Sequence, residues 1–283
     1  MGITVLILKF YPVYQPGIVF GFRWAMRIRN KLIVLVCIIV SWFATCDLPT
    51  QPGPMPKKII DTKFEPGLNV FGVLRADDIP GSSFIHVEKA VTTEEMYEGV
   101  DIFITDAWIQ LTDSLTGFES VFISSPDTTE EGYYFNNGFN PQPGHHYLLE
   151  ILSGDFPALR GETTIPVKPA LVPQSLSATD KTVQFELQLT SDTYQYNIYL
   201  FFDEYYLEKQ ISNESEGVRC IRFDFSNGTE QPTGLRIIGY DRNLAVYLNS
   251  SPSFIPQTFH EIVNTVENGY GCFGSLAVTE IPL

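Results

Sequence analysis

The stretch Thr182-Val-Gln-Phe-Glu-Leu-Gln-Leu-Thr190 shows the cleanest alternation of apolar and polar residues in the chain. Successive side chains of a β-strand point to opposite faces, so this pattern predicts a strand with one buried face. The apolar side is formed by Val183, Phe185, Leu187 and Leu189, and the polar side by Gln184, Glu186 and Gln188. The aromatic-rich run at 194–202 follows and is predicted to be its hairpin partner.

Further strands are predicted on both sides of this hairpin, because short apolar runs recur there between Gly, Pro, Asn and Asp residues. They cover residues 68–74, 83–88, 101–111, 117–124, 132–135, 146–151, 159–167, 218–225 and 235–248. Short strands at this spacing are typical of a β-sandwich, so the chain is predicted to be all-β.

One loop and one helix are predicted in the remaining segments. Residues 92–99 are polar and acidic and are predicted to be a loop. The one helix expected lies at 256–267, where apolar residues recur at helical spacing before Asn268-Gly269. Its stripe consists of Ile255, Phe259, Ile262, Val263 and Val266.

The best internal boundary is Lys168-Pro169-Ala-Leu-Val-Pro173, since two prolines in a short stretch favour an extended connection. We therefore expect a β-sandwich at 59–169 and a second β-rich domain at 170–283. The segment 47–58 is rich in Pro and Gly and is interpreted as a flexible tether.

The N-terminal region 26–46 has the layout of a secretory signal. Arg27, Arg29 and Lys31 precede the apolar run 32–45, which Cys46 follows. A membrane span needs about 20 apolar residues, so a cleaved signal is favoured over a transmembrane helix. The position of Cys46 resembles the lipidation site of bacterial lipoproteins, and an ordinary signal with a coincidental cysteine is the alternative.

Residues 1–25 precede this signal and are broken by Lys9, Pro12 and Pro16. We interpret them as an upstream extension that results from a start codon assigned too early, with Met26 as the real start. A genuine N-terminal extension is the alternative. If Cys46 is acylated, it becomes the mature N-terminus and holds an exported protein on a membrane surface.

Charge restricts the classes of partner. The formal net charge is −15, and residues 1–46 hold five Lys or Arg and no Asp or Glu, so the chain after Cys46 carries −20. An acidic surface repels phosphate backbones and anionic lipids, which argues against nucleic acid as a partner. Cations and basic protein surfaces remain compatible with it.

Two cysteines remain after the signal, Cys220 and Cys272. An exported compartment permits them to form a disulfide, and two free thiols are the alternative. The sequence alone does not place their Cα atoms within bonding reach.

Motifs for catalysis or cofactor binding are missing from the sequence: there is no Gly-x-Ser-x-Gly, no His-Glu-x-x-His, no phosphate-binding loop and no EF-hand loop. The four histidines are His86, His145, His146 and His260. We therefore expect no catalytic residues, no metal and no cofactor, and a protein that is not an enzyme. A hydrolase with a site assembled only in space is left open.

Three kinds of residue are weighed as binding groups. His145-His146 follow Pro143-Gly144 and are expected to be exposed turn residues rather than a metal pair. The acidic pairs Asp77-Asp78, Glu94-Glu95 and Glu130-Glu131 are expected to be solvated loops. Tyr205 and Tyr206, which follow Asp203-Glu204, are the aromatic residues most expected to face a ligand.

Several segments rich in glycine and aromatic residues carry a resemblance to a known family. They are Ala107-Trp-Ile-Gln-Leu-Thr-Asp113, Gly132-Tyr133, Gly144-His-His-Tyr-Leu-Leu-Glu-Ile151, Thr163-Thr-Ile-Pro166 and Glu267-Asn-Gly-Tyr-Gly-Cys-Phe-Gly274. Together they resemble the DUF4249 family of Bacteroidetes-type lipoproteins over about residues 60–280. The resemblance implies an Ig-like or transthyretin-like sandwich followed by a second β-rich region. It also implies an association with TonB-dependent outer-membrane receptors.

The favoured hypothesis is a lipid-anchored binding or accessory module of the cell envelope, in the outer membrane of a Gram-negative bacterium. Its partner would be an outer-membrane transporter or an extracellular glycan or peptide. The alternatives are a structural or adhesive surface protein that uses its strand edges, and an envelope hydrolase.

Overall fold

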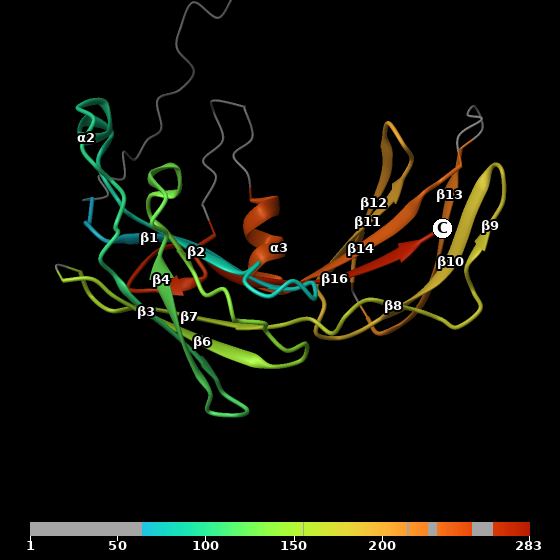
Figure 1. The fold of residues 1–283 in the computed structure, drawn as a ribbon, viewed down its shortest axis with the longest axis horizontal. Coiled ribbons are helices and arrows are strands. Elements are labelled where there is room, and N and C mark those ends of the chain that lie inside the picture. The colour runs from blue at the N-terminus through green and yellow to red at the C-terminus, as the bar shows by residue number, and fades with distance from the viewer. Residues whose placement is uncertain (1–63, 155, 214, 226–230, 251–262) are drawn as a thin grey trace, which may run out of the picture. The chain divides into compact units, whose positions relative to one another are not determined.

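The fold is built almost entirely from β-strands (Figure 1). This computed structural model describes residues 64–154, 156–213, 215–225, 231–250 and 263–283, all within one compact unit, Lys63–Leu283. The elements of the first half are β1 (Leu68–Ala76), β2 (Phe84–Lys89), α2 (Thr93–Tyr97), β3 (Trp108–Asp113), β4 (Glu119–Ser124), the 3-10 helix Thr128–Glu130, β5 (Tyr133–Phe135), β6 (His146–Leu152) and β7 (Leu159–Thr164).

The second half continues with strands and one longer helix. Its elements are β8 (Ala170–Leu171), β9 (Ser177–Ala178), β10 (Thr182–Leu189), β11 (Gln195–Phe201), β12 (Tyr206–Ser212), β13 (Gly217–Asp224), β14 (Gly234–Tyr240), α3 (Arg242–Asn249), β15 (Val266–Glu267) and β16 (Gly269–Pro282). The predicted all-β class, a sandwich followed by further β structure, is confirmed.

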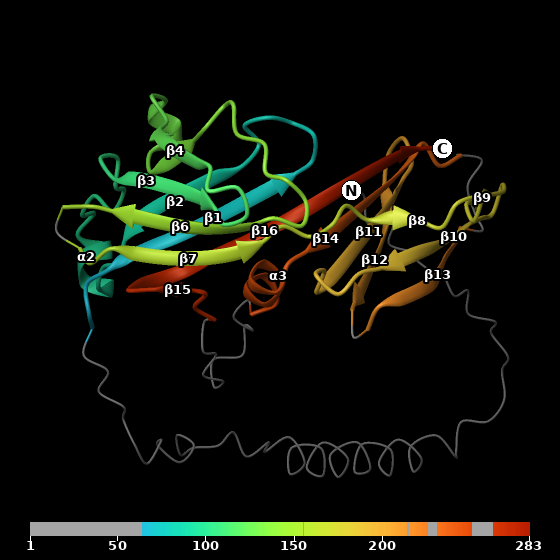
Figure 2. The same ribbon diagram turned by 90° about the horizontal axis from the view of Figure 1, so that it is seen from below.

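Two sheets contain these strands. The larger has twelve strands in the order β12-β11-β14-β16-β1-β2-β5-β4-β3-β6-β7-β15, and the smaller has the order β13-β10-β8, with β9 also paired to β10. The long strand β16 connects the two halves of the larger sheet (Figure 2). Its first part runs parallel to β1, from Gly269 to Ala277, and its last part runs antiparallel to β14, from Leu276 to Pro282.

Two large hydrophobic cores and a smaller cluster beside α3 are found among the described residues. The first is filled mainly from β1 to β7, and the second from β10 to β14. The predicted strand with one buried face is confirmed in β10. Val183, Phe185 and Leu187 are fully buried, while the residues between them are exposed. Burial of each such side chain stabilises the fold by roughly 1.5–3 kcal/mol.

The C-terminal strand contributes to both halves. Phe273 and Ala277 of β16 belong to the first core, although they lie in the predicted second domain. The division into 59–169 and 170–283 stays a prediction. Strand β16 belongs to the second of these segments but contributes side chains to the core of the first. The segments 1–25, 26–46 and 47–58, with Cys46, lie outside the described residues, as does His260. In the part of the chain that is described, no helix is long and apolar enough to cross a membrane.

Four local predictions need correction. The run 194–202 contains strand β11, but it is not the hairpin partner of β10, because β11 pairs with β12 and β14 in the larger sheet whereas β10 pairs with β13 in the smaller one. The strand expected over 235–248 ends at Tyr240, and α3 follows because Asp241 caps the helix by accepting a hydrogen bond from Leu244 N at 2.8 Å. The loop expected at 92–99 contains α2, which begins with a capping box between Thr92 and Glu95. Most of the helix expected at 256–267 lies outside the described residues, but its last two residues, Val266 and Glu267, form strand β15.

The two cysteines are free thiols. Cys220 is exposed on β13, whereas Cys272 is buried on β16, where burial raises the pKa of its thiol to about 12. They belong to strands of different sheets. The disulfide alternative is therefore not what the structure shows.

Candidate ligand-binding site

Side chains from four neighbouring strands form ordered rows on one face of the larger sheet. In the central row, Glu208 of β12, Tyr199 of β11, Arg236 of β14 and Glu280 of β16 are direct neighbours across the strands. The row beside it holds Tyr206 and Phe201. Because residues at alternate positions share a face, these side chains all lie on the same side of the sheet.

Three aromatic rings, those of Tyr199, Phe201 and Tyr206, form what we call the aromatic platform. Tyr199 and Tyr206 meet edge to face with ring centroids 5.5 Å apart, and the Phe201 centroid is 6.0 Å from that of Tyr206. The Arg236 guanidinium lies over the Phe201 ring at 5.1 Å. Tyr206 keeps 54% of its surface exposed, so it offers an open ring edge and hydroxyl to a ligand.

Of the two tyrosines predicted to face a ligand, only Tyr206 is part of this platform. Tyr205 turns to Phe202 of the second core and stacks on it, with ring centroids 4.5 Å apart and nearly parallel planes. Adjacent residues at the start of a strand point to opposite sides, which explains why the two tyrosines separate.

A chain of amide side chains extends the platform toward α3. Asn249 of α3 donates to Gln195 Oε1 at 2.7 Å, and Gln195 Nε2 donates to Asn197 Oδ1 at 2.9 Å. Asn197 in turn reaches the Tyr199 hydroxyl at 3.3 Å. Burial, reinforced by the nearby Glu208 carboxylate, raises the pKa of Tyr199, so its hydroxyl stays protonated and can donate.

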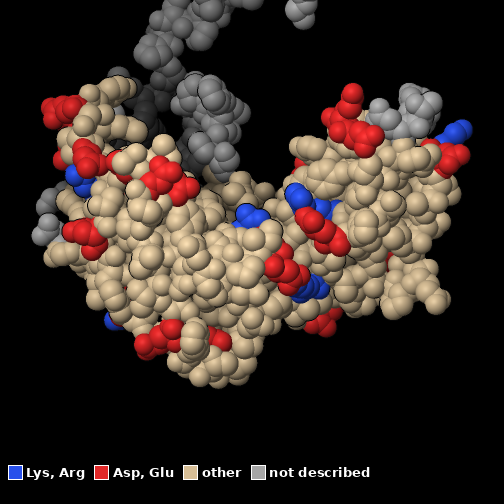
Figure 3. Space-filling model, in the orientation of Figure 1, with Lys and Arg blue, Asp and Glu red and all other residues tan. Residues whose placement is uncertain are grey.

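A cavity of about 600 Å³ adjoins the platform, and we call it the arginine hollow. Its lining consists of Arg75, Asp77, Asp78, Ile79, Lys168, Arg236, Ile238, Leu276, Val278, Thr279 and Glu280. Arg236 lines the hollow and lies over the Phe201 ring of the platform, so the two form one continuous site. Figure 3 shows basic and acidic side chains side by side near the centre of this view.

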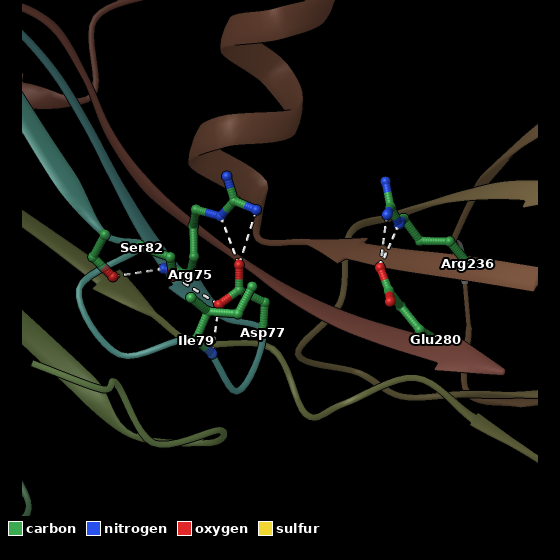
Figure 4. A network of polar contacts seen from close by, with 7 residues as sticks. Arg75, Asp77, Ile79, Ser82, Arg236 and Glu280 are labelled. Carbon is green, nitrogen blue, oxygen red and sulfur yellow. Dashed lines mark hydrogen bonds and ion pairs between the residues drawn. The ribbon is translucent and has the colours of Figure 1, made fainter.

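Each cation of the hollow has a carboxylate partner. Arg75 lies 2.8 Å from Asp77, Arg236 lies 2.7 Å from Glu280, and Lys168 pairs with Asp78. Figure 4 shows the two arginine pairs, one beside the turn after β1 and one on the neighbouring strands β14 and β16. The three pairs leave the hollow without net charge, and Ile238, Leu276 and Val278 supply apolar surface between them.

The turn after β1 fixes the carboxylate that orients Arg75. The side chain of Asp77 is only 5% exposed, and its Oδ1 accepts hydrogen bonds from Ser82 Oγ at 2.7 Å and from Ile79 N at 3.2 Å. The expectation that Asp77-Asp78 is a solvated loop is therefore wrong for Asp77. The available signal in the sequence was Arg75 two residues upstream, on the same face of the strand.

The three histidines in the described part of the chain take structural positions. His145 is not an exposed turn residue, because its Nδ1 lies 2.8 Å from the buried carboxylate of Asp113. Its neighbour His146 lies 3.0 Å from Thr164 Oγ1, and His86 packs on Tyr133 with ring centroids 4.2 Å apart. No group of three or more His, Cys, Asp or Glu residues with metal-binding geometry occurs among the described residues.

Chemically, the site combines donors, acceptors and aromatic surface. The guanidinium groups donate several hydrogen bonds in a plane, the carboxylates and amides accept them, and the rings stack on C–H faces of a ligand. This arrangement suits binding of a polar, ring-containing molecule. Sequence reasoning missed Arg236 and Glu280, because the pairing of β14 with β16 is not readable from local patterns.

The fold is that of an all-β protein of two sheets, with charged and aromatic side chains gathered on one face of the larger sheet. The chain belongs to the DUF4249 family, described as a domain of unknown function, which matches residues 54–250. No curated protein matches the chain.

Three solved structures match the chain at low sequence identity and low TM-score. The FN1-FN3 domains of chicken CNTN1 share 13% identity at a TM-score of 0.29, over 76% of this chain and 66% of that one, so the chain spans just under two thirds of its length. The chicken interferon gamma receptor alpha chain shares 7% identity at a TM-score of 0.22, over 62% and 88%. Dpr11 IG1 bound to DIP-gamma IG+IG2 shares 7% identity at 0.22, over 75% and 98%.

Proposed function

We propose that the protein is a non-catalytic, lipid-anchored binding module of the cell envelope that binds a glycan. The observation that carries the proposal is the continuity of the aromatic platform with the arginine hollow through Arg236, which stacks on Phe201 and pairs with Glu280. One ligand can thereby stack on rings and exchange hydrogen bonds with charged groups at the same time.

The charge balance of the hollow favours an uncharged ligand. Three cations face three carboxylates, so neither a strongly anionic nor a strongly cationic ligand gains net attraction. Sugar hydroxyls both donate and accept, and one hydroxyl can bridge a guanidinium and a carboxylate of the same pair. The C–H faces of a sugar ring fit against Tyr199 and Tyr206.

The membrane anchor rests on the sequence. Cys46 ends a segment with the layout of a lipoprotein signal, and the Pro/Gly tether 47–58 follows it. An acyl chain at Cys46 would place the binding module at an outer-membrane surface. Mass spectrometry of the mature N-terminus decides this part of the proposal: an acylated Cys46 supports it, and an N-terminus at any other residue contradicts it.

The family resemblance supports a companion of a TonB-dependent outer-membrane transporter as the biological context. In that role the module would hold a glycan close to the transporter that imports it. The proposal assigns binding to this chain and transport to its partner.

A glycan array tests the binding function. The wild-type protein is expected to retain a defined set of oligosaccharides, and Arg236→Met is expected to weaken that binding by about tenfold or more, because it removes charge-assisted hydrogen bonds and the stack on Phe201. Arg160→Met is the matched control, since Arg160 also pairs with a carboxylate, Glu150, at 3.0 Å but lies outside the hollow. Equal effects of the two changes, or retention of peptides instead of glycans, would contradict the proposal.

A further inference from the structure

A second surface, on β3, β4 and β6, exposes a row of large apolar side chains. Trp108 of β3 pairs with Leu152 of β6. On the other side of β3, Ile109 pairs with Phe122 of β4, and the next residue of β4, Ile123, lies beside Trp108. Their exposed fractions are 41% for Trp108, 43% for Leu152 and 69% for Ile123. We call these three residues the tryptophan row.

Core packing does not account for this row. The neighbours Ile109, Phe122 and Ile151 point to the opposite side of the same strands and are fully or almost fully buried in the first core. Strand alternation then puts the outward positions in solvent, where sandwich strands normally carry polar residues. Contiguous exposed apolar side chains on adjacent strands mark an interaction surface.

The row continues into an acidic border. Val121, 45% exposed, lies beside Gln110 in the next row. Beyond it lies a cavity of about 530 Å³ whose charged lining is Glu119, Glu150, Arg160, Glu162 and Glu267. Since Arg160 pairs with Glu150, the border retains a net negative charge.

This surface shares no residue with the arginine hollow or the aromatic platform. Its composition is also different, with an apolar centre and an acidic border instead of balanced ion pairs. A ligand on one site therefore leaves the residues of the other uncovered.

We propose that the tryptophan row and its acidic border form a docking surface for a protein with an apolar patch bordered by Lys or Arg. Protein interfaces place aromatic residues at a dry centre and charges at the rim, and Trp is the residue most enriched among binding hot spots. Charge complementarity selects the occupant: a second copy would bring like-charged borders together, and an anionic membrane would be repelled. A basic-rimmed protein surface gains both contributions.

Intrinsic fluorescence tests the surface directly. The chain contains three tryptophans, Trp24, Trp42 and Trp108. Trp24 and Trp42 precede Cys46, so a mature protein that begins at Cys46 reports on the row alone, and Trp24→Phe with Trp42→Phe gives the same result in the full chain. The probes are a short synthetic peptide of alternating Lys and Leu, the same peptide with Glu in place of Lys, and neutral phosphatidylcholine vesicles. We expect a saturable shift of Trp108 emission to shorter wavelength with the Lys peptide only.

Salt and variants separate docking from nonspecific attraction. About 0.5 M NaCl, which shortens the Debye length to roughly 4 Å, is expected to weaken the response at least fivefold. The double variant Glu119→Gln/Glu162→Gln is expected to weaken it severalfold at low salt. Ile123→Ser should weaken it about tenfold, whereas Val218→Ser, a change at a 55% exposed position on β13, should leave it unchanged.

Each other outcome overturns the proposal. An equal response to both peptides shows that charge does not select the partner. A response to the vesicles assigns the row to a membrane, and an emission shift that grows with protein concentration alone, together with a dimer in sedimentation, assigns it to a second copy. No response to the Lys peptide removes the docking surface and leaves glycan binding at the arginine hollow unaffected.

Discussion

Asp241 has a carboxyl group that is buried inside the fold, with 5% of the residue exposed. Its Oδ2 lies 2.6 Å from Thr163 Oγ1, which lies 2.8 Å from Ser275 Oγ, which in turn lies 2.9 Å from Thr164 O. Two hydroxyl groups supply only two protons for these three contacts. While Asp241 is ionised, Thr163 can donate to Asp241 or to Ser275 but not to both. A protonated Asp241 would supply the third proton by donating to Thr163, and every contact in the chain would then be a hydrogen bond.

Burial also raises the pKa of Asp241 above its ordinary 3.8, although hydrogen bonds from Thr163 and backbone amides act in the opposite direction. A raised pKa in the folded state means that this group stabilises the protein most below pH 3.8. That contribution is lost as the pH rises through the pKa of the folded state. We predict that Asp241→Asn, whose amide can donate to Thr163 at every pH, removes this dependence.

Urea unfolding of wild type and Asp241→Asn across the acidic to neutral range measures this effect. The Asn variant should gain stability relative to wild type as the pH rises, while Asp241→Ala should lose about 1 kcal/mol through the missing helix cap. If Asp241→Asn and Asp241→Ala destabilise the protein equally at neutral pH, Asp241 acts as a charged helix cap, and the inference that its carboxyl is protonated is wrong.

Asp113 shows the opposite behaviour. Burial by itself would raise the pKa of its carboxyl, but hydrogen bonds from His145, from Thr116 at 2.7 Å and from Leu115 N at 2.9 Å lower it to about 2. This depressed pKa makes Asp113 a source of stability above pH 3.8, which is lost as the pH falls through about 2.

We predict that Asp113→Asn lowers the melting temperature at pH 7. The gap to wild type should narrow as the pH falls through about 2, because the wild-type carboxyl is protonated there and becomes neutral like the amide. Thermal melts at a series of pH values check this. A gap that is constant with pH would show that the substitution acts through packing rather than charge.

At the scale of elements, the close contact between α3 and β16 depends on a glycine, Gly274, at which β16 has no side chain. A Cβ built on Gly274 would lie 2.7 Å from Leu244 Cβ and equally close to Leu244 N, so the helix would have to move. We predict that Gly274→Ala destabilises the protein by about 1–3 kcal/mol. Gly154→Ala is the control, because nothing lies within 4 Å of its added Cβ. Denaturant unfolding of both variants should show a loss only for Gly274→Ala.

The same region shows where sequence reasoning stops. In β10 the alternation extends over eight residues and defines both the strand and its buried face. In 235–248 the apolar residues continue without a break from β14 into α3, and only Asp241, which caps the helix, marks the change. A single capping residue is a weaker pattern than a long run of apolar residues, so the sequence predicted a continuous strand.

The candidate site was partly visible in the sequence. Tyr206 could be found because it follows an acidic turn after a strand. In the sequence Tyr205 is equivalent to Tyr206. In the structure the two side chains point to opposite sides of the chain at the start of β12, Tyr205 to Phe202 and Tyr206 to Tyr199. Arg236 and Glu280 could not be paired, because they are 44 residues apart and meet only through the register of β14 with β16.

At the scale of the whole molecule, β16 is the strand that builds the site. It pairs with β1, which carries Arg75, and with β14, which carries Arg236, so groups from both halves of the sequence converge on one sheet face. Strand β16 contributes Phe273 to the first core and Cys272 to the smaller cluster beside α3, and its Ile281 packs against the second core. Specificity of this face therefore depends on pairing between distant segments rather than on a local motif.

The measurement that tests glycan binding most directly compares two adjacent tyrosines. Isothermal titration with the best ligand of the array should show Tyr206→Ala binding about three- to tenfold more weakly than wild type, as expected for the loss of one stacking contact. Tyr205→Ala, which removes a tyrosine 43% exposed but stacked on Phe202, should bind as wild type does. Equal binding by all three proteins, or a loss confined to Tyr205→Ala, would contradict the assignment of the aromatic platform as the ligand site.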